Sequence, residues 1–91
     1  MTNDDFEKLW EETCYYIDIA GLSRKLLLFY TGGYSIKQAL TIKNREIVEQ
    51  RVQRFHDAMY DMLEDGLFPW IANEHKDDLT GWLFAKIDSY I

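Results

Sequence analysis

The stretch NREIVEQRVQRFHDAMYDMLE, residues 44–64, carries the clearest structural signal in the chain. Its apolar side chains recur every three or four residues, which is the spacing of one face of an α-helix: Val48, Val52, Phe55, Met59, Met62 and Leu63. Asn44 can cap the start of this helix and Gly66 can end it. The opposite face carries Arg45, Glu49, Gln53 and Asp57, which we expect to face solvent. We therefore predict a helix of about 20 residues, roughly 30 Å long, as the centre of the fold.

A second helix is predicted from Asn3 to Ala20. Its apolar stripe comprises Phe6, Leu9, Trp10, Cys14 and Ile17. Tyr15, Tyr16 and Ile19 fall off this stripe. The helix is therefore either packed on two sides or offers an aromatic patch to the outside.

A last helix is predicted to start near Asp77 or Asp78 and to run to the end of the sequence. Its stripe comprises Leu79, Leu83, Ile87 and Tyr90 or Ile91. Because apolar residues extend to the last position, we expect the final turn to be docked on the core.

Residues 26–42, LLLFYTGGYSIKQALTI, allow two structures. The first half is too continuously apolar to show a period, so it fits either a buried helix or one strand of a hairpin. The alternation in the second half breaks at Gln38 and Ala39, which favours helix. In that case Gly32 or Gly33 ends one helix, and Ser35 and Gln38 form a capping box at the next. We expect two short helices, with a β-hairpin in an α+β fold as the alternative.

Length and composition limit the architecture. The chain has 91 residues, 47% of them hydrophobic, which suffices for one core and scarcely for a second. We predict an all-α fold, a compact single-domain bundle of four to five helices over residues 1–91. No apolar run approaches the roughly 18 to 20 residues that span a bilayer, and the first residues are acidic where a secretion signal is basic. The single cysteine cannot form a disulfide within the chain, so we expect a cytoplasmic protein.

No residue pattern indicates catalysis or a bound metal. His56 lacks a second histidine at turn spacing, and His75 lies in a polar segment. Asp57, Asp61 and Asp65 repeat every four residues along one side of the central helix, which predicts an exposed ridge of similar carboxylates and not an acid–base pair. We expect a protein that is not an enzyme and that uses no cofactor and no metal.

Charge is distributed unevenly along the sequence. The net charge is −6, with six acids against one base in residues 1–20 and eight acids against two bases in residues 57–91. Residues 21–56 carry seven bases against two acids. This asymmetry indicates either a basic centre neutralised by its acidic flanks or two faces of opposite sign that meet different partners.

The acids and aromatic residues together favour protein recognition. We predict a non-catalytic binding or inhibitor protein that blocks a basic or nucleic-acid-binding partner sterically and electrostatically. Small immunity proteins that neutralise toxin nucleases and anti-defence inhibitors of host nucleases have a similar size and charge, although no motif connects this chain to either. The predicted contact residues are Glu7, Glu11, Glu12, Tyr15, Asp18, Asp57, Asp61 and Asp65.

Two alternatives stay open. Residues 34–55 can be drawn as a helix-turn-helix regulator that contacts nucleic acid through the basic segment 24–54. The contact residues would be Lys37, Lys43, Arg45, Arg51 and Arg54. The negative net charge makes direct nucleic-acid binding the weaker hypothesis. Surplus apolar residues, including Ile19, Phe68 and Phe84, leave room for a homodimer.

Overall fold

The computed structural model describes residues 1–66 and 73–89. Their regular secondary structure is entirely helical: α1 (Asn3–Ile19), α2 (Lys25–Tyr30), α3 (Ile36–Ala39), α4 (Arg45–Glu64) and α6 (Leu79–Asp88). The predicted all-α bundle is thus confirmed. The hairpin alternative is wrong, because residues 26–42 form α2, α3 and their connections. Among the described helices, none combines the length and the hydropathy needed to cross a membrane.

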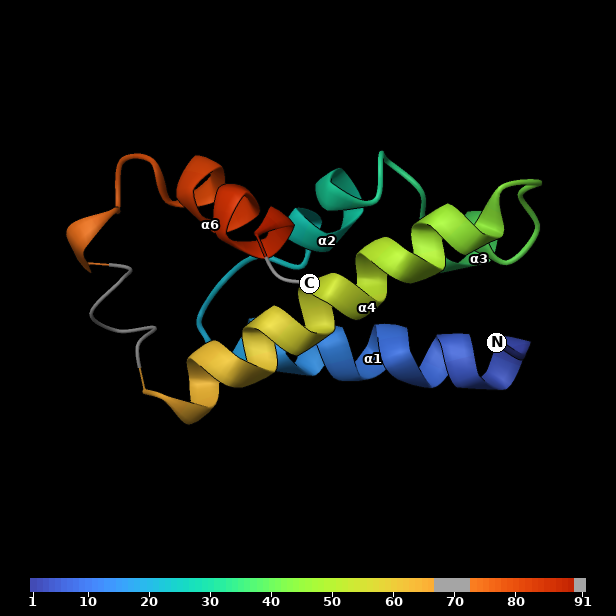
Figure 1. Ribbon diagram of the computed structural model, residues 1–91, viewed down its shortest axis with the longest axis horizontal. Helices are drawn as coiled ribbons and strands as arrows, with labels where there is room; N and C mark the ends of the chain where they lie inside the picture. The colour runs from blue at the N-terminus through green and yellow to red at the C-terminus, as the bar shows by residue number, and fades with distance from the viewer. Residues whose placement is uncertain (67–72, 90–91) are drawn as a thin grey trace.

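The helix α4 lies in the middle of the molecule. Figure 1 shows α1 running along one side of it, with α2 and α6 on the other. The apolar face predicted for α4 is buried, including both of its methionines: Val48, Val52, Phe55, Met59 and Met62. From α1, Phe6 and Ile17 are fully buried against this face. The apolar residues that recur every three or four positions in α1 and α4 therefore form the core between these helices, as expected for amphipathic helices.

Tyr30 connects α2 to α4 and α6. The ring is 3% exposed and packs against Phe55 and Phe84, with centroid distances of 5.6 and 5.3 Å. Its hydroxyl donates a 2.6 Å hydrogen bond to Asp88 Oδ1. This single side chain therefore joins residues 58 positions apart in the sequence. Phe84, which we considered free for a homodimer, is partly buried here.

The turn that ends α2 at residues 31–33 has the predicted geometry, in which a glycine ends the helix. Gly32 and Gly33 both have positive φ, 90° and 91°. The Gly33 amide donates to the Leu28 carbonyl at 2.8 Å, which closes the last turn of α2. Ser35 and Gln38 then form the predicted capping box at the start of α3. Local residue chemistry therefore favours helices in this part of the chain, and burial of Leu27 and Tyr30 in the core adds to it.

The prediction that Arg45, Glu49, Gln53 and Asp57 of α4 face solvent is partly wrong. The side chains of Arg45 and Glu49 pair at 2.9 Å and are only 20% and 14% exposed. The Arg45 guanidinium lies 5.2 Å from the centre of the Phe6 ring, so α1 covers this flank of α4 as well. Gln53 is half-buried and Asp57 is exposed as expected. The covered face of α4 is thus wider than its apolar stripe.

The helix ends follow the predictions with small differences. α1 begins at Asn3, where Thr2 Oγ1 accepts a hydrogen bond from the Asp5 amide at 3.1 Å. Asn44 precedes α4 as expected, but its side chain makes no capping hydrogen bond. α6 starts at Leu79, one or two residues later than predicted. The expected docking of Tyr90 and Ile91, and the position of Phe68, lie outside the described residues.

Candidate functional site

An exposed aromatic area lies where α1 and α4 run side by side. We call it the tyrosine patch and define it as Tyr15, Tyr16, Ile19 and Tyr60. Tyr15, Ile19 and Tyr60 are 61%, 56% and 44% exposed, and Tyr16 is half-buried between the two helices. The Tyr16 ring lies 6.2 Å from the Tyr15 ring and 5.9 Å from the Tyr60 ring. The residues off the stripe of α1 therefore form an outward patch, one of the two outcomes that the sequence left open.

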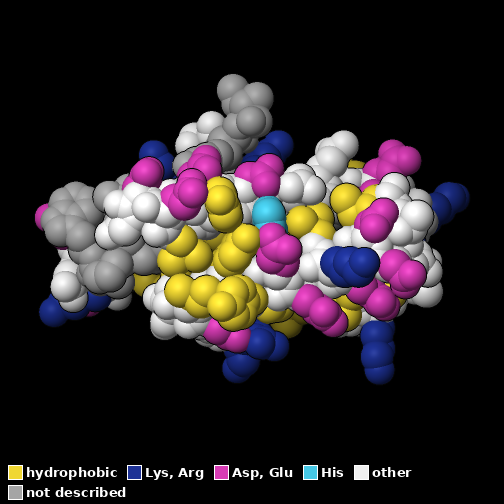
Figure 2. All heavy atoms as spheres, turned by 90° about the horizontal axis from the view of Figure 1, so that it is seen from below, with side chains coloured by type: hydrophobic (Ala, Val, Ile, Leu, Met, Phe, Trp, Pro, Cys, Tyr) yellow, Lys and Arg dark blue, Asp and Glu magenta, His cyan; other side chains and the backbone are white. Residues whose placement is uncertain are grey.

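Carboxylates border this patch. Figure 2 shows the face of the molecule seen from below, where a hydrophobic area is flanked by acidic side chains. Glu12 accepts a hydrogen bond from the Tyr16 hydroxyl at 2.8 Å, and Glu64 accepts one from the Tyr60 hydroxyl at 3.2 Å. Two of the tyrosines therefore hold their polar ends toward acids of their own helices, one turn away.

His56 ties the two helices together at the edge of the patch. Its Nε2 lies 2.8 Å from Glu12 Oε1 of α1, and its Nδ1 lies 3.0 Å from Asp57 Oδ1 of α4. The imidazole ring is 5.1 Å from the Tyr16 ring. Only the doubly protonated ring donates to both carboxylates, because a neutral tautomer has one N–H. The network orients Tyr16 and Glu12 relative to α4.

These hydrogen bonds change the protonation of their members. The bonds from His56 and Tyr16 lower the pKa of Glu12, so its carboxylate is the favoured form. The bond to Glu12 raises the pKa of Tyr16 to about 12. The bond to Glu64 raises the pKa of Tyr60. At neutral pH the Glu12 carboxylate is therefore anionic, while Tyr16 and Tyr60 are neutral hydrogen-bond donors.

The structure separates the predicted contact residues into three groups. Tyr15, Glu12 and Asp57 lie at the tyrosine patch. On the wheel of α1, Glu7, Glu11 and Asp18 lie on the flank away from α4, where Asp18 pairs with Arg24 at 2.5 Å. Asp61 and Asp65 are exposed, but each step of four residues rotates by about 40° and turns them progressively away from α1.

The predicted nucleic-acid residues do not form one basic surface. Arg45 is held against α1 by Glu49, Asn3 and the Met1 carbonyl. Arg51 donates to the Tyr30 carbonyl at 3.0 Å and stacks over the Tyr30 ring at 5.3 Å. Arg54, which is exposed, lies one turn from Arg51 and close to the Tyr30 hydroxyl, so these two arginines share one side of α4. Arg45 lies on the side that faces α1, so the three arginines do not form one surface.

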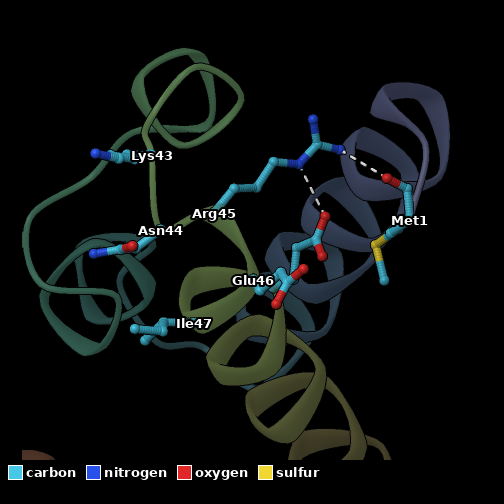
Figure 3. Close-up of a pocket in the computed structure, with 7 residues that line it drawn as sticks. Met1, Lys43, Asn44, Arg45, Glu46 and Ile47 are labelled. Carbon is cyan, nitrogen blue, oxygen red and sulfur yellow. Dashed lines mark hydrogen bonds and ion pairs between the residues drawn. The ribbon is translucent and has the colours of Figure 1, made fainter.

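A cavity at the start of α4 illustrates this separation. It has a volume of about 570 Å³ and is lined by residues 43–47, Met1 and Glu49. In Figure 3, Arg45 reaches toward Met1 while Lys43 points in the opposite direction. The two bases consequently do not converge on a common ligand position.

Residues 34–55 also differ from the geometry of a DNA-binding helix-turn-helix. The helix that would precede the turn, α3, has only four residues. The helix that would read the groove, α4, keeps one exposed face, but this face carries Asp57 and Asp61 beside Arg54, and these carboxylates repel a phosphate backbone. Lys37 is exposed on α3.

Residues 1–66 and 73–89 contain no group of three or more histidine, cysteine or acidic side chains placed to hold a metal. His75 stacks on Trp82 at 5.1 Å, far in sequence from His56. Burial raises the pKa of the Cys14 thiol, which makes it a poor nucleophile.

Five residues of the patch and its border are not predicted as contact residues from the sequence: Tyr16, Ile19, His56, Tyr60 and Glu64. A signal for four of them exists at turn spacing. Tyr16 follows Glu12 by four positions, and Tyr60 lies four positions after His56 and four before Glu64. The sequence does not reveal how α1 and α4 are aligned, and this alignment places Glu12 next to His56.

Comparison of the chain with protein-family models, with curated proteins and with solved structures gave no match.

Proposed function

We propose that this protein is a non-catalytic binding protein or inhibitor that docks, through the tyrosine patch, on a basic or nucleic-acid-binding protein. The observation that carries the proposal is the patch itself: exposed aromatic side chains on a rigid pair of helices, bordered by carboxylates. The patch combines two features that binding surfaces need, apolar area for affinity and charge for orientation.

The aromatic residues supply the contact area. Tyrosine is enriched at binding hot spots because its ring is large, has few rotatable bonds and carries one polar end. Tyr15 is 61% exposed and is in no hydrogen bond with the described residues, so its hydroxyl is free to bond a partner. Tyr16 and Tyr60 are already oriented by Glu12 and Glu64. Little side-chain entropy is therefore lost when a partner covers these two rings.

The carboxylates select the partner. Glu12, Asp57 and Glu64 surround the patch on a protein whose net charge is −6. A negative surface accelerates encounters with a positive one and penalises acidic partners. A protein that binds nucleic acid offers a positive groove, and occupying that groove would block it both sterically and electrostatically. The same charge repels a phosphate backbone, so nucleic acid itself is a poor ligand for this face.

The proposal is tested by charge reversal on the border. The immobilised protein captures its partner from an extract of the native host, the partner is identified and purified, and association rates are measured at low and high salt. Asp57→Lys with Glu64→Lys reverses two exposed acids of the border, and Glu74→Lys with Asp77→Lys is the control with the same change in net charge. We expect the first pair to slow association about tenfold or more and the control pair to have a much smaller effect. Equal rates for both pairs, unaffected by salt, would contradict the proposal.

A further inference from the structure

A second cavity lies on the flank of α1 that faces away from α4. It has a volume of about 460 Å³ and is lined by Trp10, Glu11, Cys14, Arg24 and Ile36. Cys14 is only 7% exposed, and Trp10 and Ile36 are partly buried against the core. The lining of the cavity therefore combines apolar side chains with the charged side chains of Glu11 and Arg24. We call it the Trp10 cleft.

The charges at its mouth leave one carboxylate unpaired. The Arg24 guanidinium donates through Nε to both oxygens of Asp18 at 3.1 Å, and a second nitrogen reaches Asp18 Oδ2 at 2.5 Å. These two charges compensate each other. Glu11 has no ion-pair partner within residues 1–66 and 73–89. The mouth of the cleft is thus net negative, with the free charge on the α1 side.

We propose that the Trp10 cleft accepts an arginine side chain of the basic partner. This inference rests on the proposed function and specifies one anchor of the same interface, because Glu11 and Tyr15 are neighbours one turn apart on α1. Trp10 lines the cleft and is only partly buried, and tryptophan is the best aromatic partner for a cation. The aliphatic stem of the arginine contacts Ile36 and Cys14, while the guanidinium donates to the Glu11 carboxylate.

The chemistry of the cleft favours arginine over lysine. A planar guanidinium can stack on the indole and at the same time form a forked pair with a carboxylate, whereas the compact ammonium of lysine is more strongly hydrated. An uncharged chain of similar length would keep only the apolar contacts. The order of affinity expected for the free side chains is therefore arginine, then lysine, then norleucine.

A titration of the isolated protein tests this order without the partner. The probe is Nα-acetyl-arginine N-methylamide, and the readout is the indole N–H signal of Trp10 in nitrogen-15 correlated NMR spectra, assigned with Trp10→Phe. We expect a saturable shift with a millimolar dissociation constant, the range expected of a single-residue ligand. The norleucine analogue should bind several-fold more weakly. Glu11→Gln should reduce the arginine affinity about threefold to tenfold, while Glu7→Gln, an exposed acid one turn earlier on α1, should leave it within about twofold.

Two results would overturn the inference: an indole signal that does not move, or equal dissociation constants for the arginine and norleucine probes. Neither result bears on the tyrosine patch, whose test uses Tyr15, Asp57 and Glu64. Failure of the arginine titration together with salt-sensitive partner binding therefore refutes the Trp10 cleft alone.

Discussion

Substitution of Arg45 distinguishes two roles for this residue: stabilising the fold and contacting nucleic acid. Within the fold, Arg45 pairs with Glu49 at 2.9 Å, donates to the Met1 carbonyl at 3.1 Å and stacks on Phe6 at 5.2 Å. If these contacts are its main role, Arg45→Ala should destabilise the protein. If the basic segment is a nucleic-acid interface, the same substitution should leave stability unchanged and weaken binding to an oligonucleotide.

The expected cost follows from the contacts. A cation–π contact contributes about 0.5–1 kcal/mol, and a partly buried ion pair contributes about 1 kcal/mol. Removing the arginine also leaves Glu49, which is 14% exposed, without its cation. Allowing for non-additivity, we expect a loss of about 2 kcal/mol in the free energy of unfolding. For a domain of this size such a loss lowers Tm by about 8–16 °C.

Urea denaturation followed by circular dichroism measures this loss, and the slope of the transition should stay constant. Lys37→Ala is the control, because Lys37 is an exposed base on α3 and should change stability by less than about 0.5 kcal/mol. Arg45→Met with Glu49→Met removes both charges together and should recover part of the loss. The reasoning is refuted if Arg45→Ala is as stable as Lys37→Ala.

Three further predictions follow from contacts elsewhere in the fold. Tyr30→Phe removes the hydrogen bond to Asp88 and should lower the free energy of unfolding by about 1 kcal/mol. Tyr30→Ala also removes the buried ring and should lower it by about 3–5 kcal/mol, as measured by thermal unfolding. Similar losses for both variants would contradict the packing of α6. Because the folded-state pKa of Glu12 is lowered, its contribution to stability is present above its unfolded pKa and is lost as pH falls through the folded value. Glu12→Gln should therefore flatten the acid limb of a stability–pH curve, and it should also move the tyrosinate absorbance of Tyr16 from about pH 12 toward pH 10; an unchanged titration would exclude the bond. Gly32→Ala forces a side chain into the left-handed region at φ 90° and should cost about 1–2 kcal/mol by urea denaturation, so an unaffected midpoint would contradict the turn geometry.

The helices were predictable because their signals are local. The period of Val48, Val52, Phe55 and Met59 requires only that one face of α4 be buried, and the capping box at Ser35 requires only neighbouring residues. Arg45 shows where this reasoning ends. The sequence pattern predicts that a charged residue off the apolar stripe faces solvent. In the structure, however, α1 packs beside Arg45, and its guanidinium lies over the Phe6 ring.

The candidate site was only partly predictable for the same reason. Tyr15 and Glu12 were identified because acids and aromatic residues alternate on α1. His56 was set aside because it lacks a partner at turn spacing within α4. Its partner Glu12 is 44 positions away and is brought to it by the register of the two helices. A contact of that sequence separation is invisible to periodicity, since it depends on how the two apolar stripes interlock.

The tyrosine patch is tested most directly by the affinity of the purified partner for Tyr15→Ser. Tyr15 is 61% exposed, so its loss should not disturb the fold, and Tyr34→Ser provides a matched control at another exposed tyrosine, 40% exposed. If Tyr15 anchors the complex, its substitution should raise the dissociation constant by about 30-fold, corresponding to about 2 kcal/mol, while Tyr34→Ser should stay within about threefold. Equal dissociation constants for the wild type and Tyr15→Ser would show that the partner binds elsewhere.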